Sequence, residues 1–173
     1  MVIQCSSEDG PSEAGQPLSA PTVSVLPVAT RRDVQRANAL LEGKRQRVTP
    51  QRVALLAALL GGPLHPTAAE LHAKLRTGQP SLSLATVYKN LATLARMGMV
   101  VQVNVPGDDE RFEANLHPHA NFLCTSCREI TDIGGPQFEE FEDRVRATVK
   151  GEIDQVQILI RGTCARCRRR GRK

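Results

Sequence analysis

The chain has 173 residues, a net charge of +5, 40% hydrophobic residues and only 3% aromatic residues. This length accommodates one domain or two small ones. Five cysteines are too few for a disulfide scaffold, and no apolar run approaches the roughly 20 residues that span a membrane. No basic segment precedes an apolar one at the N-terminus, as a signal peptide requires. We therefore expect a soluble cytoplasmic protein with reduced thiols and no membrane partner.

The charges are strongly segregated along the chain. Residues 31–105 carry eleven Lys and Arg against three Asp and Glu, whereas residues 106–163 carry six against twelve. The last ten residues carry six basic residues and no acidic one. A basic surface attracts a polyanion such as DNA, and carboxylates attract a cation. The two halves are therefore predicted to have different partners.

Residues 1–30 are rich in Ser, Pro and Gly and are predicted to form a disordered arm that contains Cys5 as an incidental thiol. Residues 31–115 show four helical periods, then two short strands joined by a Pro-Gly-Asp-Asp-Glu turn. The helices are predicted at residues 31–45, 50–60, 68–76 and 84–97, and the strands at residues 100–105 and from 111. Their N-caps are predicted to be Thr49, Thr67 and Ser83. This order predicts an N-terminal winged helix-turn-helix, a DNA-binding domain.

Residues 116–167 predict a small dimerisation and metal-binding domain, so that the whole chain is α+β. Two short strands, at residues 121–124 and 129–133, surround a Cys-Thr-Ser-Cys turn, and a helix follows from residue 136 to about residue 150. The β-branched run 153–160 predicts a strand buried on at least one face. About 50 residues make a small core, so a metal ion or dimerisation is expected to stabilise it. Residues 168–173 are predicted to be a disordered basic tail.

Two CxxC pairs predict a structural zinc site. Cys124 and Cys127 form the first pair, Cys164 and Cys167 the second, and 36 residues separate the pairs. Four thiolates complete a tetrahedral Zn²⁺ site with no open position, and Arg128 is one of the nearby arginines that offset its negative charge. Redox pairs or disulfides are the alternatives. Redox CxxC motifs normally occur singly before a helix, and neither pair here is predicted to precede one.

The helix predicted at residues 84–97 is the expected recognition helix, because it is the second helix of the helix-turn-helix and precedes the hairpin. Its apolar stripe leaves Thr86, Tyr88 and Lys89 toward solvent, where they can contact bases or phosphates. The alternative is that Tyr88 packs at the helix edge as ordinary amphipathic core. Arg47 and Arg52 belong to a basic cluster between the first two helices, where phosphate contacts are expected.

A second group of metal-competent residues lies at or near the junction of the two halves: His65, Glu113, His117, His119 and Asp132. Each is a weak signal alone, because such residues are usually solvated surface groups. Together they offer mixed nitrogen and oxygen ligands, which suit Fe²⁺, Mn²⁺ or Zn²⁺ better than Mg²⁺ or Ca²⁺. The sequence therefore predicts a second, exchangeable metal site.

These motifs occur in an order that resembles the ferric uptake regulator (Fur) family of bacterial metalloregulators, over about residues 31–167. The matching stretches are Arg47-Val-Thr-Pro-Gln-Arg52, His65-Pro-Thr-Ala-Ala-Glu70, Leu84-Ala-Thr-Val-Tyr-Lys89, Arg111-Phe-Glu113, the segment from His119 to Cys127, and Gly162-Thr-Cys-Ala-Arg-Cys167. No single stretch identifies the family, whereas the ordered set is specific. The resemblance implies a homodimeric, metal-dependent transcriptional regulator, usually a repressor.

The resemblance also implies roles for particular residues. The regulatory ion would be held by residues such as His65, Glu113, His119 and Asp132. Tyr88 and Lys89 would contact the major groove, and a basic residue at the position of Arg47 the minor groove.

One departure concerns the regulatory site. Many family members carry His-x-His before the first CxxC, whereas Asn121 stands at the second position here. We expect either a weaker four-ligand site or a further ligand from His117. Glu113 favours an iron or manganese sensor, because peroxide sensors of the family usually carry Asp there. Peroxide sensing through oxidation of His65 or His119 stays an open alternative.

The expected mechanism is that the regulatory metal joins the two halves and so fixes two recognition helices at the spacing of a palindromic operator. No pair of nucleophile and base stands out, so no enzyme is predicted. The main alternative is a metal-independent DNA-binding protein with structural zinc only. A zinc-dependent hydrolase or deaminase is disfavoured, because four cysteines close the zinc site and no His-Glu-x-x-His motif is present.

Overall fold

The computed structural model describes residues 28–44, 47–61 and 65–171. Almost all of the predicted N-terminal arm, with Cys5, lies outside the described residues, as do residues 172 and 173 of the predicted tail. Among the described helices, none is both long and apolar enough to cross a membrane.

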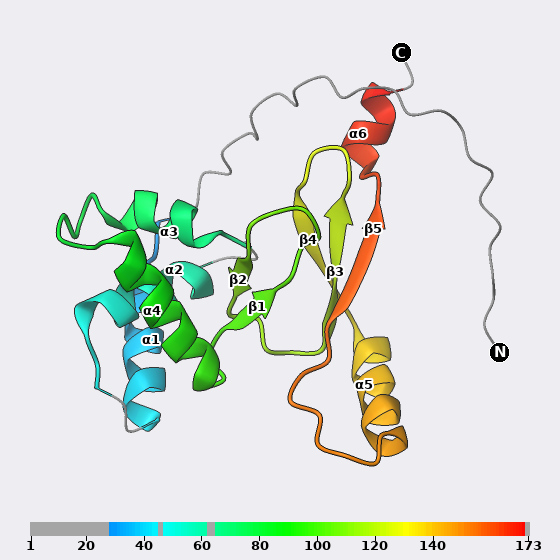
Figure 1. The fold of residues 1–173 in the computed structure, drawn as a ribbon, viewed down its shortest axis with the longest axis horizontal. Coiled ribbons are helices and arrows are strands. Elements are labelled where there is room, and N and C mark those ends of the chain that lie inside the picture. The colour runs from blue at the N-terminus through cyan, green and yellow to red at the C-terminus, as the bar shows by residue number, and fades with distance from the viewer. Residues whose placement is uncertain (1–27, 45–46, 62–64, 172–173) are drawn as a thin grey trace.

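Four helices and a two-stranded hairpin make up the first half of the described chain. They are α1 (Arg31–Gly43), α2 (Pro50–Leu60), α3 (Ala68–Leu75), α4 (Leu84–Arg96), β1 (Val101–Val103) and β2 (Arg111–Glu113). The strands pair antiparallel, with Gln102 opposite Phe112. All six elements lie within a few residues of their predicted positions (Figure 1).

Side-chain caps explain where these helices begin. Thr49, Thr67 and Ser83 accept hydrogen bonds from the backbone N–H three residues further on, as predicted, and so start α2, α3 and α4. Thr30 was predicted to belong to the arm, which is wrong. It forms a capping box with Asp33 and begins α1, so ordered structure starts before residue 31.

The helices share one apolar core. Leu55 and Leu56 of α2 meet Leu91 and Leu94 of α4, and all four are fully buried. Phe112 of β2 joins the same cluster, so the hairpin is packed on the helices rather than free in solvent.

The second half is a three-stranded sheet with two helices. Its elements are β3 (His119–Cys124), β4 (Ile130–Gly134), α5 (Pro136–Thr148), β5 (Ile158–Gly162) and α6 (Ala165–Arg170). The strand order is β4-β3-β5, with β4 antiparallel and β5 parallel to the central β3. Figure 1 places α5 and α6 at opposite ends of this sheet.

Two predictions for this half are wrong. The strand predicted at residues 153–160 begins only at Ile158, because its position is set by its register with β3, from Ala120 opposite Ile158 to Cys124 opposite Gly162. Its side chains are at best partly buried. Residues 168–170 were predicted to be disordered but form the last turn of α6, which Cys164 caps.

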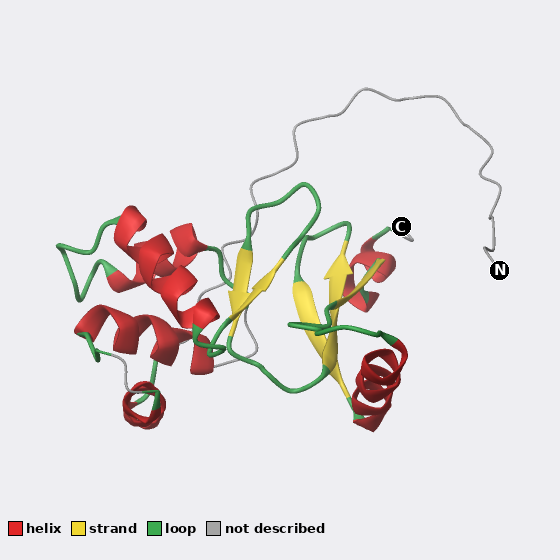
Figure 2. Cartoon of the chain, turned by 60° about the horizontal axis from the view of Figure 1, so that its bottom comes forward, coloured by secondary structure: helices red, strands yellow, loops and turns green. Residues whose placement is uncertain are grey.

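The hairpin lies between the helices and the three-stranded sheet, as Figure 2 shows. On its sheet side, Val103 and Val105 form a second buried cluster with Leu123 of β3. Ile130 and Leu159 extend this cluster. The hairpin therefore contributes to two cores and sets how the two halves meet.

Candidate metal and DNA-binding sites

The four predicted zinc ligands come together where β3 ends and α6 begins. The Sγ atoms of Cys124, Cys127, Cys164 and Cys167 all lie within 4.8 Å of one another. All four are free cysteines, and the Cys127 and Cys164 sulfurs are 3.9 Å apart, which excludes a disulfide between them in this structure. The parallel pairing of β5 with β3 brings the two CxxC pairs together. The last paired residues are Cys124 and Gly162, so Cys164 follows directly beside the first CxxC.

The electrostatics of the cluster favour a bound cation. Burial opposes ionisation of Cys124, but backbone N–H groups of Cys164, Cys127 and Ser126 outweigh it and lower the pKa of Cys124 to about 6. A hydrogen bond to Cys164, together with burial and the other sulfurs, raises the pKa of Cys167 to about 12. Four thiolates therefore cannot coexist near neutral pH without a positive charge among them, and a soft divalent ion supplies it.

The arginines near the cluster have different roles. Arg166 lies beside Cys127, and a hydrogen bond to that sulfur raises the pKa of Arg166. It also binds Glu129 at 2.6 Å. Arg128 was predicted to offset the charge of the sulfur cluster, but its side chain is bound to the hairpin. The second CxxC also precedes a helix, contrary to prediction, because Cys164 is the N-cap of α6.

The second predicted group converges at the seam between the two halves. His65 Nε2 lies 2.8 Å from Glu113 Oε2 and 3.0 Å from Asp132 Oδ1. His119 Nε2 lies 3.1 Å from the same Glu113 oxygen. One ligand atom from each of the four residues lies within 4.8 Å of the others. These residues come from the segment before α3, from β2, from β3 and from β4.

The seam cluster fits a divalent cation. Burial opposes protonation of His65, but hydrogen bonds to Asp132 and Glu113 outweigh it and raise the pKa of His65 to about 9. The hydrogen bond from His65 in turn lowers the pKa of Asp132. Asp132 Oδ1 is buried, and the nitrogen it faces is His65 Nε2, at 3.0 Å. The proton on His65 thus lies between two carboxylates, and a metal ion can take its place.

Neighbouring residues orient three of the four ligand candidates. Asn115 Nδ2 donates to Asp132 Oδ2 at 2.9 Å, and Arg111 donates to the carbonyl of His65 at 2.9 Å. Neither role could be predicted from the sequence, because nothing in its pattern pairs these residues with distant partners. The exposed side chain of His117 lies outside the cluster, but its carbonyl is 2.7 Å from Nδ1 of His119. This contact fixes His119 with Nε2 toward the cluster.

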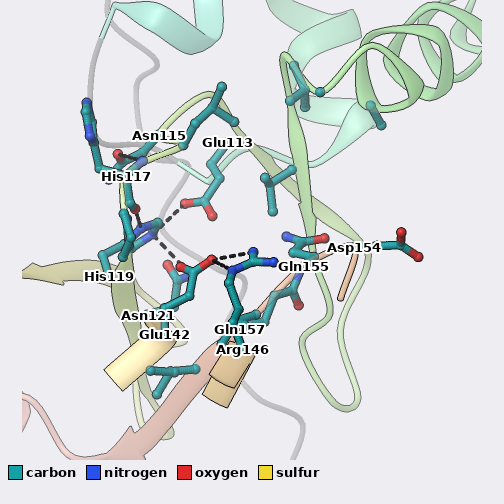
Figure 3. A pocket seen from close by; sticks show the side chains of 18 residues that line it. Glu113, Asn115, His117, His119, Asn121, Glu142, Arg146, Asp154, Gln155 and Gln157 are labelled. Atoms are coloured by element: carbon teal, nitrogen blue, oxygen red, sulfur yellow. Dashed lines mark hydrogen bonds and ion pairs between the residues drawn. The ribbon is translucent and has the colours of Figure 1, made fainter. Parts of the chain in front are cut away.

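Asn121 lies beside the cluster rather than in it. Its Nδ2 is 3.5 Å from His119 Nε2, and its Oδ1 is buried without a hydrogen-bond partner among the described residues. Glu113, His119 and Asn121 line one wall of a pocket of about 300 Å³ (Figure 3). Arg146, which is paired with Glu142, also lines this pocket. Small solutes can therefore approach the seam from this side.

The predicted DNA-contacting residues lie on α4, before α2 and in the first turn of α2. Tyr88 is 46% exposed and Lys89 is exposed, so Tyr88 is not a core residue. Thr86 is partly buried, and its hydroxyl is bonded to Ser83. Arg47 is exposed. Arg52, in contrast, is bonded within the protein, since Nε donates to Asn90 Oδ1 and a terminal nitrogen donates to the carbonyl of Arg47.

The sequence matches the model of the ferric uptake regulator family over residues 44–161. The chain belongs to this family. It is 32% identical over 125 residues to the peroxide-responsive repressor PerR of Staphylococcus epidermidis, covering 72% of this chain and 83% of that relative. It is 33% identical over 121 residues to PerR of Staphylococcus aureus strain USA300, covering 70% of this chain and 82% of the relative.

Solved structures of the ferric uptake regulator family agree with the fold. The Campylobacter jejuni peroxide stress regulator matches with a TM-score of 0.61 and 27% identity, covering 78% of this chain and 98% of that one. The Helicobacter pylori ferric uptake regulator matches with a TM-score of 0.61 and 18% identity, covering 79% and 92%. The second likeness supports the fold alone. The family match includes all four seam residues, and the second CxxC lies just beyond it.

Proposed function

We propose that this Fur-family protein is a metal-responsive transcriptional repressor that binds operator DNA when Fe²⁺ or Mn²⁺ occupies the seam. The observation that carries this proposal is the convergence of His65, Glu113, His119 and Asp132 from four separate segments. An ion bound there ties the helical half to the three-stranded sheet. Such an ion favours the arrangement of the two halves to which it binds more tightly. The size of this effect is limited by the difference in its binding free energy between the arrangements.

The four-cysteine cluster is proposed to hold a structural Zn²⁺. Its sulfurs offer four soft ligands, which leaves no position for a substrate, so the ion does not catalyse a reaction. The seam offers two imidazoles and two carboxylates, a harder set that suits Fe²⁺ or Mn²⁺. The two sites are thus separated by chemistry as well as by position.

The helical half is proposed to be a winged helix-turn-helix DNA-binding domain spanning residues 31–115, with α4 as its recognition helix and β1–β2 as its wing. The exposed side chains of Tyr88 and Lys89 would contact the major groove, with Thr86 close by. Exposed Arg47 would contact the DNA backbone or the minor groove, held in place by Arg52. An operator is expected to be palindromic if two copies bind it together.

Residues 116–167 are proposed to be the dimerisation domain of a homodimer. The apolar side chains of α5 support this, because no residue of that helix is buried in the single chain. Phe141 is 47% exposed. Ile133 and Ile160, on the outer strands of the sheet, are also exposed. Packing these groups against a second copy would remove apolar surface from water.

The test is operator binding with defined metals. The zinc-loaded protein would be used with Mn²⁺ to select a duplex from a random DNA library, and binding to that duplex would then be titrated with Mn²⁺ and with Fe²⁺. His65→Ala and His119→Ala are expected to weaken the metal response by more than about tenfold, because even residues that merely orient a ligand contribute 10–100-fold. His117→Ala is the matched control and should respond like the wild type. Equal binding with and without metal would favour the metal-independent alternative.

Peroxide sensitivity is a second proposal, favoured by the similarity to proteins named peroxide-responsive repressors. The pocket next to His119 gives a small oxidant access to the seam. Treating the Fe²⁺-loaded and Mn²⁺-loaded proteins with hydrogen peroxide, followed by mass spectrometry of peptides containing His65 and His119, tests this proposal. Oxygen added to neither histidine would refute it.

A further inference from the structure

Arg128 stands in a backbone conformation that suits glycine. Its φ is 60°, and it is the one non-glycine residue with positive φ in the part of the chain that the structure describes. Its N–H donates to the carbonyl of Cys124 at 2.8 Å and so closes the first CxxC turn. A side chain is strained in this conformation, and such strain persists where other contacts compensate for it.

The side chain of Arg128 reaches across to the other half. Its terminal nitrogen donates to the carbonyl of Pro106 at 3.2 Å and lies 3.5 Å from Asp108 Oδ2. Both partners belong to the turn between β1 and β2. The Arg128 and Asp108 side chains are only 30% and 24% exposed, so the pair is partly shielded from water. A residue of the cysteine turn thus holds the tip of the hairpin.

Asp108 connects this contact to the seam. The same Asp108 oxygen lies 3.2 Å from Arg111, and Arg111 also donates to the carbonyl of His65. A continuous polar chain therefore runs from the seam cluster through Arg111, Asp108 and Arg128 to the cysteine turn. Apolar contacts support it, because Val103 and Val105 pack on Leu123 below the turn.

The charge of the hairpin tip argues for an internal partner. Asp108, Asp109 and Glu110 are consecutive at the surface of the tip, so the tip repels DNA phosphates. Arg128 offers the opposite charge within the same chain. Moreover, Arg128 holds the tip in the same structure in which the four seam residues already lie within 4.8 Å of one another.

We propose that Arg128 is a positioning residue that docks the hairpin tip on the cysteine turn and thereby holds the two halves in the geometry that binds the seam metal. The docking itself is independent of DNA, whereas its effect on operator binding rests on the function proposed above. Losing this contact leaves both sets of metal ligands intact but lets the halves separate more often. Part of the binding free energy of the seam ion is then used to bring the two halves together, which Arg128 does in the wild type.

Arg128→Gly is the decisive variant, because glycine relieves the backbone strain while removing the contact. In the zinc-loaded full chain, hydrogen exchange of amides in residues 101–113 is expected to rise several-fold. The dissociation constant for Mn²⁺, measured by calorimetry without DNA, is expected to rise about two- to fivefold, the effect of losing an ion pair at the protein surface. Zinc content should stay at the wild-type value, and Arg128→Lys should restore part of the Mn²⁺ affinity.

Two further variants complete the test. Asp108→Asn removes the same ion pair together with the Asp108–Arg111 pair, so it should raise hairpin exchange and the Mn²⁺ dissociation constant at least as much as Arg128→Gly does. Arg144→Ala removes an exposed pair with Glu140 on α5 and should change neither measurement. The proposal would be overturned if Arg128→Gly kept the wild-type hydrogen exchange of the hairpin and the wild-type Mn²⁺ affinity. It would also be overturned if these two quantities changed only together with a loss of zinc. Operator binding that ignores metal in the wild type would instead count against the proposed function alone.

Discussion

Arg52 is predicted to stabilise the helical half rather than to contact DNA phosphates. Its Nε donates to Asn90 Oδ1 at 3.1 Å, and a terminal nitrogen donates to the carbonyl of Arg47 at 2.7 Å. Asn90 is 9% exposed, and its own Nδ2 donates to the carbonyl of Thr86 within α4. Arg52 therefore links α2, the segment before it and the proposed recognition helix.

The expected cost of Arg52→Ala follows from these contacts. A buried acceptor that loses its donor costs about 1–3 kcal/mol, and the bond to the more exposed carbonyl of Arg47 adds roughly 0.5–1 kcal/mol. We expect the free energy of unfolding to fall by about 1.5–4 kcal/mol. Arg52→Lys should lose most of the same stability, because one ammonium group does not reproduce the fork of a guanidinium.

Urea unfolding of the zinc-loaded protein measures this loss. Arg96→Ala is the matched control, since Arg96 is exposed and bonds Thr93 within its own helix, and its effect should stay within about 0.5 kcal/mol. Arg52→Ala combined with Asn90→Ala should cost less than the two changes added together. A variant Arg52→Ala with wild-type stability, and with a salt dependence of DNA binding reduced by about one, would refute this reasoning and identify Arg52 as a phosphate contact.

Four other outcomes are expected. Cys164→Ser should lose the zinc while keeping the N-cap of α6, because serine caps helices well; metal analysis and circular dichroism separate the two. Tyr88→Ala should weaken operator binding by roughly 1–3 kcal/mol without altering its salt dependence, and unchanged affinity would mean that α4 is not the recognition helix. Asn121→His should tighten Mn²⁺ or Zn²⁺ binding, measured by competition with a chelator, since imidazole is the stronger ligand. Hydrogen bonds from Thr30 lower the pKa of Asp33. The ionised Asp33 side chain therefore stabilises α1 at pH values above 3.8, the ordinary pKa of an aspartate, and this stabilisation is lost as the pH falls. The stabilities of Asp33→Asn and the wild type, measured by acid unfolding, should therefore converge at low pH.

Local signals predicted most of the fold. The caps at Thr49, Thr67 and Ser83 are short-range features that the sequence displays directly. The start of β5 was predicted wrongly because the β-branched run says nothing about register, which pairing with β3 decides. The helix at the second CxxC was missed because its cap is a cysteine rather than a usual capping residue.

The candidate sites show the same division. Residue types predicted a group of five, the four seam residues and His117, and the structure brings the four together but leaves His117 outside. Their supporting contacts, from Asn115 and Arg111, depend on distances that no sequence spacing encodes. Arg52 was predicted to contact phosphates because a basic cluster does not reveal which of its members already has partners in the protein.

Cys164 belongs to the sulfur cluster and also begins α6, where its Sγ accepts the N–H of Cys167. Metal loading and winding of the C-terminal helix are consequently coupled in one equilibrium. Arg168, Arg169 and Arg170 lie in that helix, and proteases that cleave after arginine need an extended substrate. A copy that loses its ion should fray in this segment more often, so trypsin should cleave there faster in the zinc-free protein than in the zinc-loaded protein.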